Sequence, residues 1–241
     1  MSEGRIREAG CAGTDVGALD AGWDPSGERQ AWARFVDEGT MDALNDLLAV
    51  WRHVGREDRV RWLLEMLIHG ECGADLERRA LLQVYLGQSY ERTGDYDAAE
   101  AEYRQALALE PADPWVQYFT HNNLGYCLNV RGRYKEGERV CRIATTVNPR
   151  RANAWKNLGI SLQGLGRLPE AFYAWVQATR VNPTDSRAHS LLQRLVEDHP
   201  ALLERLVEDH PELLERPDAR ADLERCRSAV ATARELYGSA G

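Results

Sequence analysis

The side chains of this sequence best suited to chemistry are carboxamides. Asn123 and Asn157 each stand two residues before a glycine that follows a leucine. An asparagine side chain offers one acceptor and two donors, so it can bond both backbone groups of an extended peptide, whatever that peptide's sequence. Neighbouring aromatic rings would add pockets for the peptide's side chains. The candidate peptide-binding residues are Tyr85, Gln88, Arg92, Phe119, Asn122, Asn123, Tyr126, Asn129, Asn153, Lys156, Asn157 and Gln163.

Groups for catalysis or metal binding are sparse by comparison. The sequence contains no G-x-S-x-G, no glycine-rich phosphate loop and no H-E-x-x-H. His199 and His210 each follow an aspartate and could be metal ligands, but we favour Asp198 and Asp209 as caps of helices that start at the next proline. A further set is expected to pack in the interior: His121, Cys127 and Cys141. We therefore expect no enzymatic activity, no cofactor and no metal.

The charge balance bears on the class of partner. The sequence has 30 Lys and Arg residues and 38 Asp and Glu residues, which gives a net charge of −8. This net charge disfavours nucleic acid or an anionic membrane as a partner. Five cysteines without a C-x-x-C pair favour a reducing compartment. The sequence shows neither a signal-peptide pattern nor an apolar run of about 18 residues. We expect a cytoplasmic protein with a protein or peptide partner; its arginine-rich basic residues fit a GC-rich, bacterial genome.

Helical blocks repeated in series are predicted to hold these side chains in place. Three leucine–glycine pairs begin the blocks: Leu86-Gly87, Leu124-Gly125 and Leu158-Gly159. A proline closes each block 24 residues after its glycine: Pro111, Pro149 and Pro183. The glycines are 38 and then 34 residues apart, so four extra residues, about one helical turn, precede Gly125. Asp113 as N-cap and Pro114 at the first helical position predict a helix that starts one turn early.

The repeated residues resemble the tetratricopeptide repeat, whose pattern W-x2-L-G-x2-Y, A-x3-F and P recurs every 34 residues. The third block matches best, with Trp155, Leu158, Gly159, Leu162, Ala171, Trp175, Ala178 and Pro183. The first block departs mainly at the tryptophan position, where it has Gln83. The middle block departs most, with His121, Leu128, Gly137 and Cys141 at four pattern positions. The resemblance covers about residues 80–185, as repeats 80–113, 118–151 and 152–185.

This resemblance implies an all-α fold: a tetratricopeptide-repeat right-handed superhelix, or α-solenoid, with an N-terminal helix pair and C-terminal capping helices. The pattern glycines should let the two helices of a repeat approach closely, and Tyr103, Cys141 and Trp175 should fill space toward the next repeat. A second set of glycines should end the first helix of each repeat: Gly94, Gly132 and Gly166. Residues 28–79 are predicted to form N-terminal helices, as a degenerate repeat that turns at Gly55, after a disordered tail over 1–27.

The C-terminal region, residues 186–241, carries a duplicated 11-residue unit. Residues 194–204 and 205–215 are identical except at Ala201 and Glu212. Eleven residues make about three helical turns, so the leucines of the two copies fall on one face. A final helix over about 218–237 is predicted to cover the open end of the repeat stack. An alternative role for these leucines is to join copies of the chain in a homo-oligomer.

The repeat resemblance also implies a function. The candidate peptide-binding residues lie on the side of each first helix that the Leu and Gly pattern leaves unused, which would be the concave groove of the superhelix. We predict a non-catalytic adaptor or scaffold that holds an extended segment of a partner protein there. The alternatives are an oligomeric structural scaffold and a chaperone for a secreted or nascent client.

The carboxylate clamp of heat-shock co-chaperones is not matched by this sequence. Val84 and Gln88 in the first repeat, and Asn153 and Asn157 in the third, stand where that clamp has Lys, Asn or Arg, and only Asn123 agrees. Arg92 and Lys156 should still leave the groove mildly positive.

Overall fold

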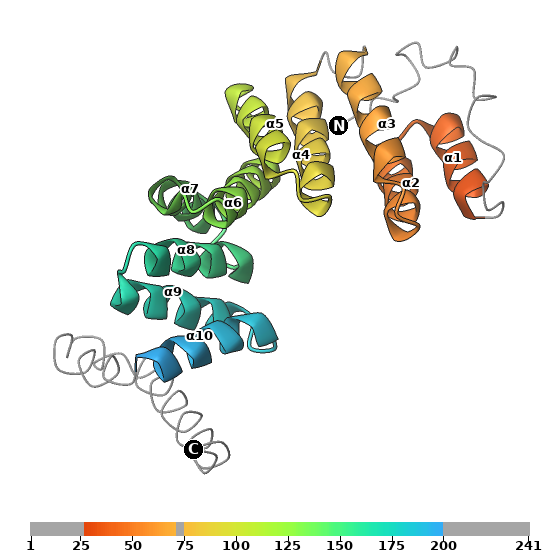
Figure 1. Ribbon diagram of the computed structural model, residues 1–241. Coiled ribbons are helices and arrows are strands. Elements are labelled where there is room, and N and C mark those ends of the chain that lie inside the picture. The colour runs from red at the N-terminus through yellow and green to blue at the C-terminus, as the bar shows by residue number, and fades with distance from the viewer. Residues whose placement is uncertain (1–26, 71–74, 200–241) are drawn as a thin grey trace. The chain divides into compact units, whose positions relative to one another are not determined.

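The structure is a computed structural model that describes residues 27–70 and 75–199 (Figure 1). Every regular element within these two ranges is an α-helix, which confirms the predicted all-α fold class. The helices belong to two compact units that divide within α6 (Pro114–Val130), after Thr120. No helix of the described ranges is long and apolar enough to cross a membrane.

The first unit holds three N-terminal helices and one complete repeat hairpin. Its helices are α1 (Gly27–Glu38), α2 (Met41–His53), α3 (Glu57–His69), α4 (Leu76–Arg92), α5 (Tyr96–Ala108) and the beginning of α6. The second unit holds the rest of α6, then α7 (Tyr134–Val147), α8 (Ala152–Gly164), α9 (Leu168–Val181) and α10 (Ser186–Asp198). The predicted helix pair before the repeats is therefore α2 and α3, with α1 in front of it.

Glycines in the left-handed region make the turns between paired helices. The φ angles are +80° at Gly94, +72° at Gly132 and +73° at Gly166, and Gly55 between α2 and α3 has +75°. In this conformation, a residue with a Cβ would be destabilised by roughly 1–2 kcal/mol. These four predicted turn positions are confirmed.

The pattern glycines allow close contact between the two helices of one repeat. A Cβ built on Gly87 would overlap the Tyr103 ring, one on Gly125 would meet Cys141 Sγ, and one on Gly159 would meet the Trp175 indole. The predicted close approach is thus confirmed. Tyr103, Cys141 and Trp175 pack onto the glycine of their own repeat, because only a glycine leaves room for them there. Cys141 also belongs to a buried cluster with Leu158 and Leu162 of the next repeat, and the same cluster joins Trp175 to Leu192 and Leu195 of α10, as expected for side chains that fill space toward the next element.

Substituting Gly125 with alanine should therefore lower the free energy of unfolding by about 1–3 kcal/mol through overpacking. The change should become nearly neutral in a Cys141→Ala background, because the nearest remaining atom of residue 141 is then Cβ, 3.8 Å from the new methyl group. Urea denaturation of the four proteins in this cycle measures the coupling. An equal cost of Gly125→Ala in both backgrounds would show that Cys141 is not the obstacle.

Helix starts follow the local capping chemistry. The backbone N–H of Trp115 donates to Asp113 Oδ1 at 2.7 Å and α6 begins at Pro114, so the early start of this helix is confirmed. Asp75 caps α4 through the backbone N–H groups of Glu77 and Arg78, so this helix begins four residues before the predicted repeat boundary at 80. The repeat pattern marks where helices pair, whereas the cap decides where a helix begins.

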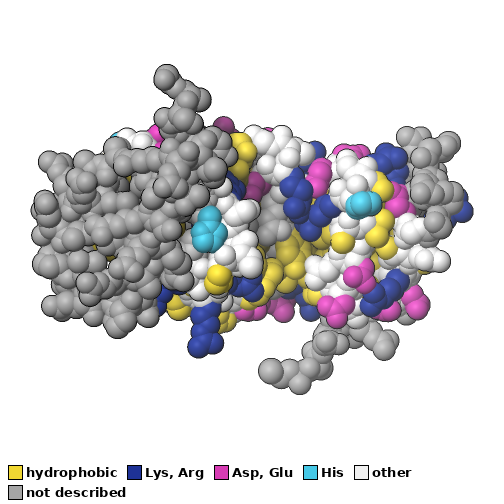
Figure 2. Space-filling view, turned by 90° about the horizontal axis from the view of Figure 1, so that it is seen from below, with side chains coloured by type: hydrophobic (Ala, Val, Ile, Leu, Met, Phe, Trp, Pro, Cys, Tyr) yellow, Lys and Arg dark blue, Asp and Glu magenta, His cyan; other side chains and the backbone are white. Residues whose placement is uncertain are grey.

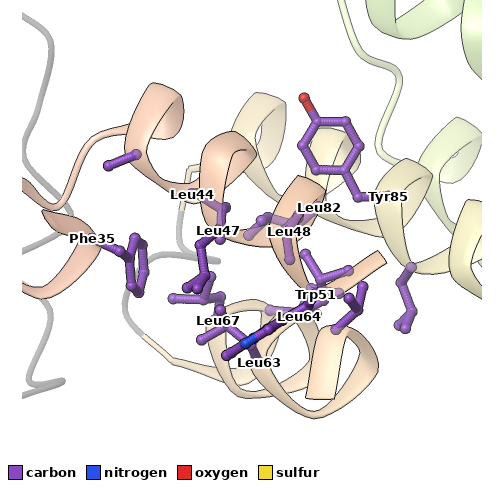
Figure 3. Packing of buried hydrophobic residues seen from close by; sticks show 14 residues of the cluster. Phe35, Leu44, Leu47, Leu48, Trp51, Leu63, Leu64, Leu67, Leu82 and Tyr85 are labelled. Atoms are coloured by element: carbon purple, nitrogen blue, oxygen red, sulfur yellow. The ribbon is translucent and has the colours of Figure 1, made fainter. Parts of the chain in front are cut away.

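The N-terminal helices bury the apolar stripe predicted from their spacing. Leu44, Leu47, Leu48 and Trp51 of α2 are fully buried, and α3 and α4 complete the cluster (Figure 3). Tyr85 of α4 lies at the edge of this cluster, and its hydroxyl group points away from it (Figure 3). The core of α1 to α3 thus supports one side of the first repeat.

Several predictions about the ends of the chain lie outside the described residues. These are the tail over 1–26, the second 11-residue unit, the terminal helix and His210. Within the first copy of the 11-residue duplication, residues 194–198 form the end of α10, and Asp198 is the last helical residue. Leu192 and Leu195 are buried against α9 and α8 residues, so α10 covers the end of the third repeat.

Candidate functional site

Three of the predicted asparagines meet between α6 and α8, together with Ser161, which was not in the predicted set. The Asn157 amide group donates to Asn122 at 3.2 Å (side-chain oxygen) and 3.3 Å (backbone oxygen). Asn129 Nδ2 donates to the Asn157 backbone oxygen at 2.8 Å, and Ser161 Oγ donates to Asn129 Oδ1 at 2.6 Å. We call Asn122, Asn129, Asn157 and Ser161 the amide network.

The amide network is interior rather than open to a ligand. Asn157 is 8% exposed, and Asn122 and Asn129 are each 6% exposed. This corrects the expectation that Asn122, Asn129 and Asn157 line an open groove. Asn122 and Asn129 are seven residues apart and Asn157 and Ser161 four apart, so each pair lies on one helix face, and the two faces pack together. A buried amide group needs partners, and here the neighbouring helix supplies them.

Loss of the Asn157 side chain should lower stability by about 1–3 kcal/mol, because Asn157→Ala leaves buried acceptors on α6 unsatisfied. Asn153→Ala is the matched control on the same helix, since Asn153 is exposed. Thermal unfolding of the two variants distinguishes the roles. Equal midpoints for both variants and the original protein would contradict a structural role of the network.

Asn123 remains accessible, unlike Asn157. Its side chain is half-buried, and Asn123 Oδ1 accepts a hydrogen bond from Asn122 Nδ2 at 2.9 Å. Tyr126 and Gln163 are also half-buried, and Asn153 is exposed. These residues are the part of the predicted set in the second unit that a ligand can reach.

The two cations of the predicted set have acidic partners. Lys156 Nζ binds Asp185, the N-cap of α10; burial opposes ionisation of this carboxyl, but the hydrogen bonds from Lys156 and Ala188 leave its pKa lowered. Arg92 Nε lies 3.0 Å from Glu57 Oε1. The mild positive charge expected from Lys156 and Arg92 is therefore neutralised by residues outside the predicted set.

An aromatic row lies on the first unit. Tyr85 and Trp115 meet edge to face with ring centroids 6.3 Å apart, and the Trp115 and Phe119 centroids are 4.2 Å apart. Tyr85 is 9% exposed, whereas Trp115 is 39% exposed. Phe119 and Gln88 are half-buried. We call Tyr85, Trp115 and Phe119 the aromatic row; its most accessible member, Trp115, was not in the predicted set.

Arg52 adjoins the aromatic row and was also missed by the sequence analysis. Its guanidinium carbon lies 5.9 Å from the centroid of the Tyr85 ring. Nε and Nη2 of Arg52 are occluded from solvent and have no hydrogen-bond partner among the described residues. Burial, and then the charge of Arg92, lower the pKa of Arg52 to about 10. No sequence signal marks this residue, because α2 precedes the repeats and carries none of their pattern.

The remaining candidates read from the sequence have interior positions. Cys127 and Cys141 are buried, and burial raises the pKa of the Cys141 thiol to about 12, as expected for packing residues. His121 is half-buried, and burial followed by the charge of Arg139 lowers its pKa. On the face seen in Figure 2, hydrophobic side chains lie next to Lys and Arg side chains. Among the predicted residues and the aromatic row, the side chains open to a ligand are therefore aromatic, amide and guanidinium groups.

Comparison with known proteins agrees with this repeat architecture. Over 96 residues the chain is 31% identical to cellulose synthase operon protein C of Pseudomonas fluorescens, covering 39% of this chain and 7% of that protein. Over 111 residues it is 29% identical to the photosystem I assembly protein Ycf3 of a Synechococcus species, covering 40% of this chain and 64% of that protein. The chain thus spans less than two thirds of either relative.

A solved structure of MamA, residues 41 to the end, from Desulfovibrio magneticus has a similar fold. The TM-score is 0.54 at 18% identity, over 80% of this chain and 94% of MamA. Family models described as tetratricopeptide repeat match residues 80–121 and 128–186. The hairpins, their turn glycines and these matches agree, and residues 80–186 of the chain are built of tetratricopeptide repeats.

Proposed function

We propose that this chain is a non-catalytic adaptor that binds an extended segment of a partner protein. The observation that carries the proposal is the aromatic row, in which Trp115 is 39% exposed and packs against the tilted ring of Phe119, 4.2 Å away between centroids. Rigid, partly exposed aromatic rings supply much of the binding energy at protein interfaces.

Two features of the relatives support a protein partner. Tetratricopeptide repeats are protein-interaction modules as a family, and the Synechococcus relative is named an assembly protein. The accessible amide groups of Gln88, Asn123 and Asn153 fit the same role, because each could bond a peptide backbone at its own position. Asn157 would contribute indirectly, by holding α6 against α8.

The proposal is tested by selecting binders from a phage library of random 12-residue peptides fused at their C-termini, with the full chain as target. Synthetic copies of the selected peptides are then measured by fluorescence anisotropy. We expect Trp115→Ala to weaken binding by about tenfold or more, since central interface tryptophans commonly cost over 1 kcal/mol when truncated.

Trp62→Ala is the matched control, because Trp62 is 40% exposed and lies on α3, outside the aromatic row. Its affinity for the same peptides should be unchanged. Failure to select any peptide, or equal losses in the two tryptophan variants, would overturn the proposed function.

A further inference from the structure

We propose that Arg52, beside the aromatic row, binds the carboxylate of an Asp or Glu side chain of the bound segment. This inference rests on the proposed function and names the chemistry of the segment: an acidic residue next to an apolar or aromatic one. Arg52 stands on α2, before the three repeats, so the position differs from the carboxylate clamp that this sequence does not match.

The state of the Arg52 guanidinium is the first argument. Nε and Nη2 are occluded and have no hydrogen-bond partner in the described part of the chain, whereas Nη1 is not among the occluded atoms. Arg52 as a whole is half-buried, so a carboxylate can reach the guanidinium at Nη1, where partial desolvation strengthens a charge-assisted hydrogen bond. The aromatic face of Tyr85, 5.9 Å away, holds the planar group in place by a cation–π contact.

The acid that acts most on Arg52 is already engaged elsewhere. This acid is Glu57, whose carboxylate is bound by Arg92 at 3.0 Å and by Ser89 Oγ at 2.5 Å. Glu57 makes no hydrogen bond to Nε or Nη2 of Arg52, so an outside carboxylate is the complementary group.

Side-chain and backbone carboxylates would both suit a guanidinium, since a planar fork of donors matches either one. We infer that the carboxylate belongs to an Asp or Glu side chain of the bound segment. The aromatic row continues from Tyr85 to Trp115 and Phe119, which fits a segment that passes along several side chains and does not end at Arg52. Peptides displayed with fused C-termini have no terminal carboxylate, so the selection itself separates the two sources.

The experiment compares peptides selected by the full chain and by its Arg52→Gln variant. We expect the original protein to select a constant Asp or Glu, and the variant to lose this preference. In anisotropy measurements, replacing that acid by its amide should weaken binding to the original protein about tenfold or more, with little further loss in the variant. Arg52→Lys should restore part of the acid preference, because it keeps the charge without the fork.

Arg61→Gln is the matched control, since Arg61 also lies over a tyrosine, Tyr90, at 5.3 Å. Arg61 already donates to Thr93 Oγ1 at 3.2 Å, so its loss should leave the acid preference intact. Urea midpoints should confirm that Arg52→Gln is folded, because the substitution removes an occluded group without a partner.

The outcomes separate the two proposals. Peptides that bind through Trp115 but show no acid preference would overturn the role of Arg52 and leave the adaptor function standing. A preference for acids that survives Arg52→Gln, or binding only by peptides with a free C-terminal carboxylate, would also overturn it. Absence of any peptide binder would instead count against the adaptor function itself.

Discussion

Replacing Trp175 with alanine is expected to lower the free energy of unfolding by about 3–5 kcal/mol, the range for a buried aromatic side chain. The side chain of Trp175, in α9, is fully buried and lies against Gly159 of α8. A side chain on residue 159 would overlap the Trp175 indole, so only glycine fits at that position. Its Nε1 also donates to the Lys156 backbone oxygen at 3.1 Å. Truncation thus removes both the contact between the paired helices and a hydrogen bond.

Urea denaturation followed by far-ultraviolet circular dichroism measures this loss. Trp175→Phe should lose less than Trp175→Ala, because it keeps a ring against Gly159 and gives up the hydrogen bond. Trp62→Ala, on the exposed side of α3, should cost below about 1 kcal/mol. A cost that small for Trp175→Ala as well would mean that the helix pair does not depend on this contact.

Arg59→Met should also destabilise the chain by about 3–5 kcal/mol, because it leaves a buried carboxylate without its cation. Arg59 Nη1 of α3 lies 3.5 Å from Glu28 Oε2 of α1, and both side chains are only 6% exposed. The ion pair ties the first described helix to the helix pair that supports Tyr85 and Arg52. Chemical denaturation of the single variant gives the cost.

The double variant Glu28→Leu/Arg59→Met supplies the control. Replacing a whole buried ion pair by apolar residues is often neutral or stabilising by about 1–4 kcal/mol, so the double variant should recover most of the loss. If both proteins are equally destabilised, packing volume rather than the unpaired charge explains the effect.

The repeat hairpins were predictable from the sequence because their determinants lie close together along the chain. Gly94, Gly132 and Gly166 end helices by a backbone preference of the residue itself. Gly159 and Trp175 are sixteen residues apart within one repeat, so their contact is between segments close together along the chain. Asp113 and Pro114 determine the start of α6 in the same local way.

The candidate site was harder to predict because exposure depends on what covers a helix, and that cover comes from another part of the chain. The periodicity placed Asn157 on an unused face of α8, but α6 packs on that face and takes up its hydrogen bonds. The same pattern predicts Lys156 as a cation of the groove, but Asp185, 29 residues later, binds its ammonium group.

Spacing and residue size along the chain were enough to predict the helical hairpins, their turns and the close approach of the paired helices. Which polar side chains already have hydrogen-bond partners depended on the folded arrangement. There, Asn122, Asn129 and Asn157 bond to one another in the interior, whereas Nε and Nη2 of Arg52, over the Tyr85 ring, have no hydrogen-bond partner in the described residues. Hydrogen bonding and desolvation are set by neighbours in space, and those neighbours come from helices that no repeat pattern connects.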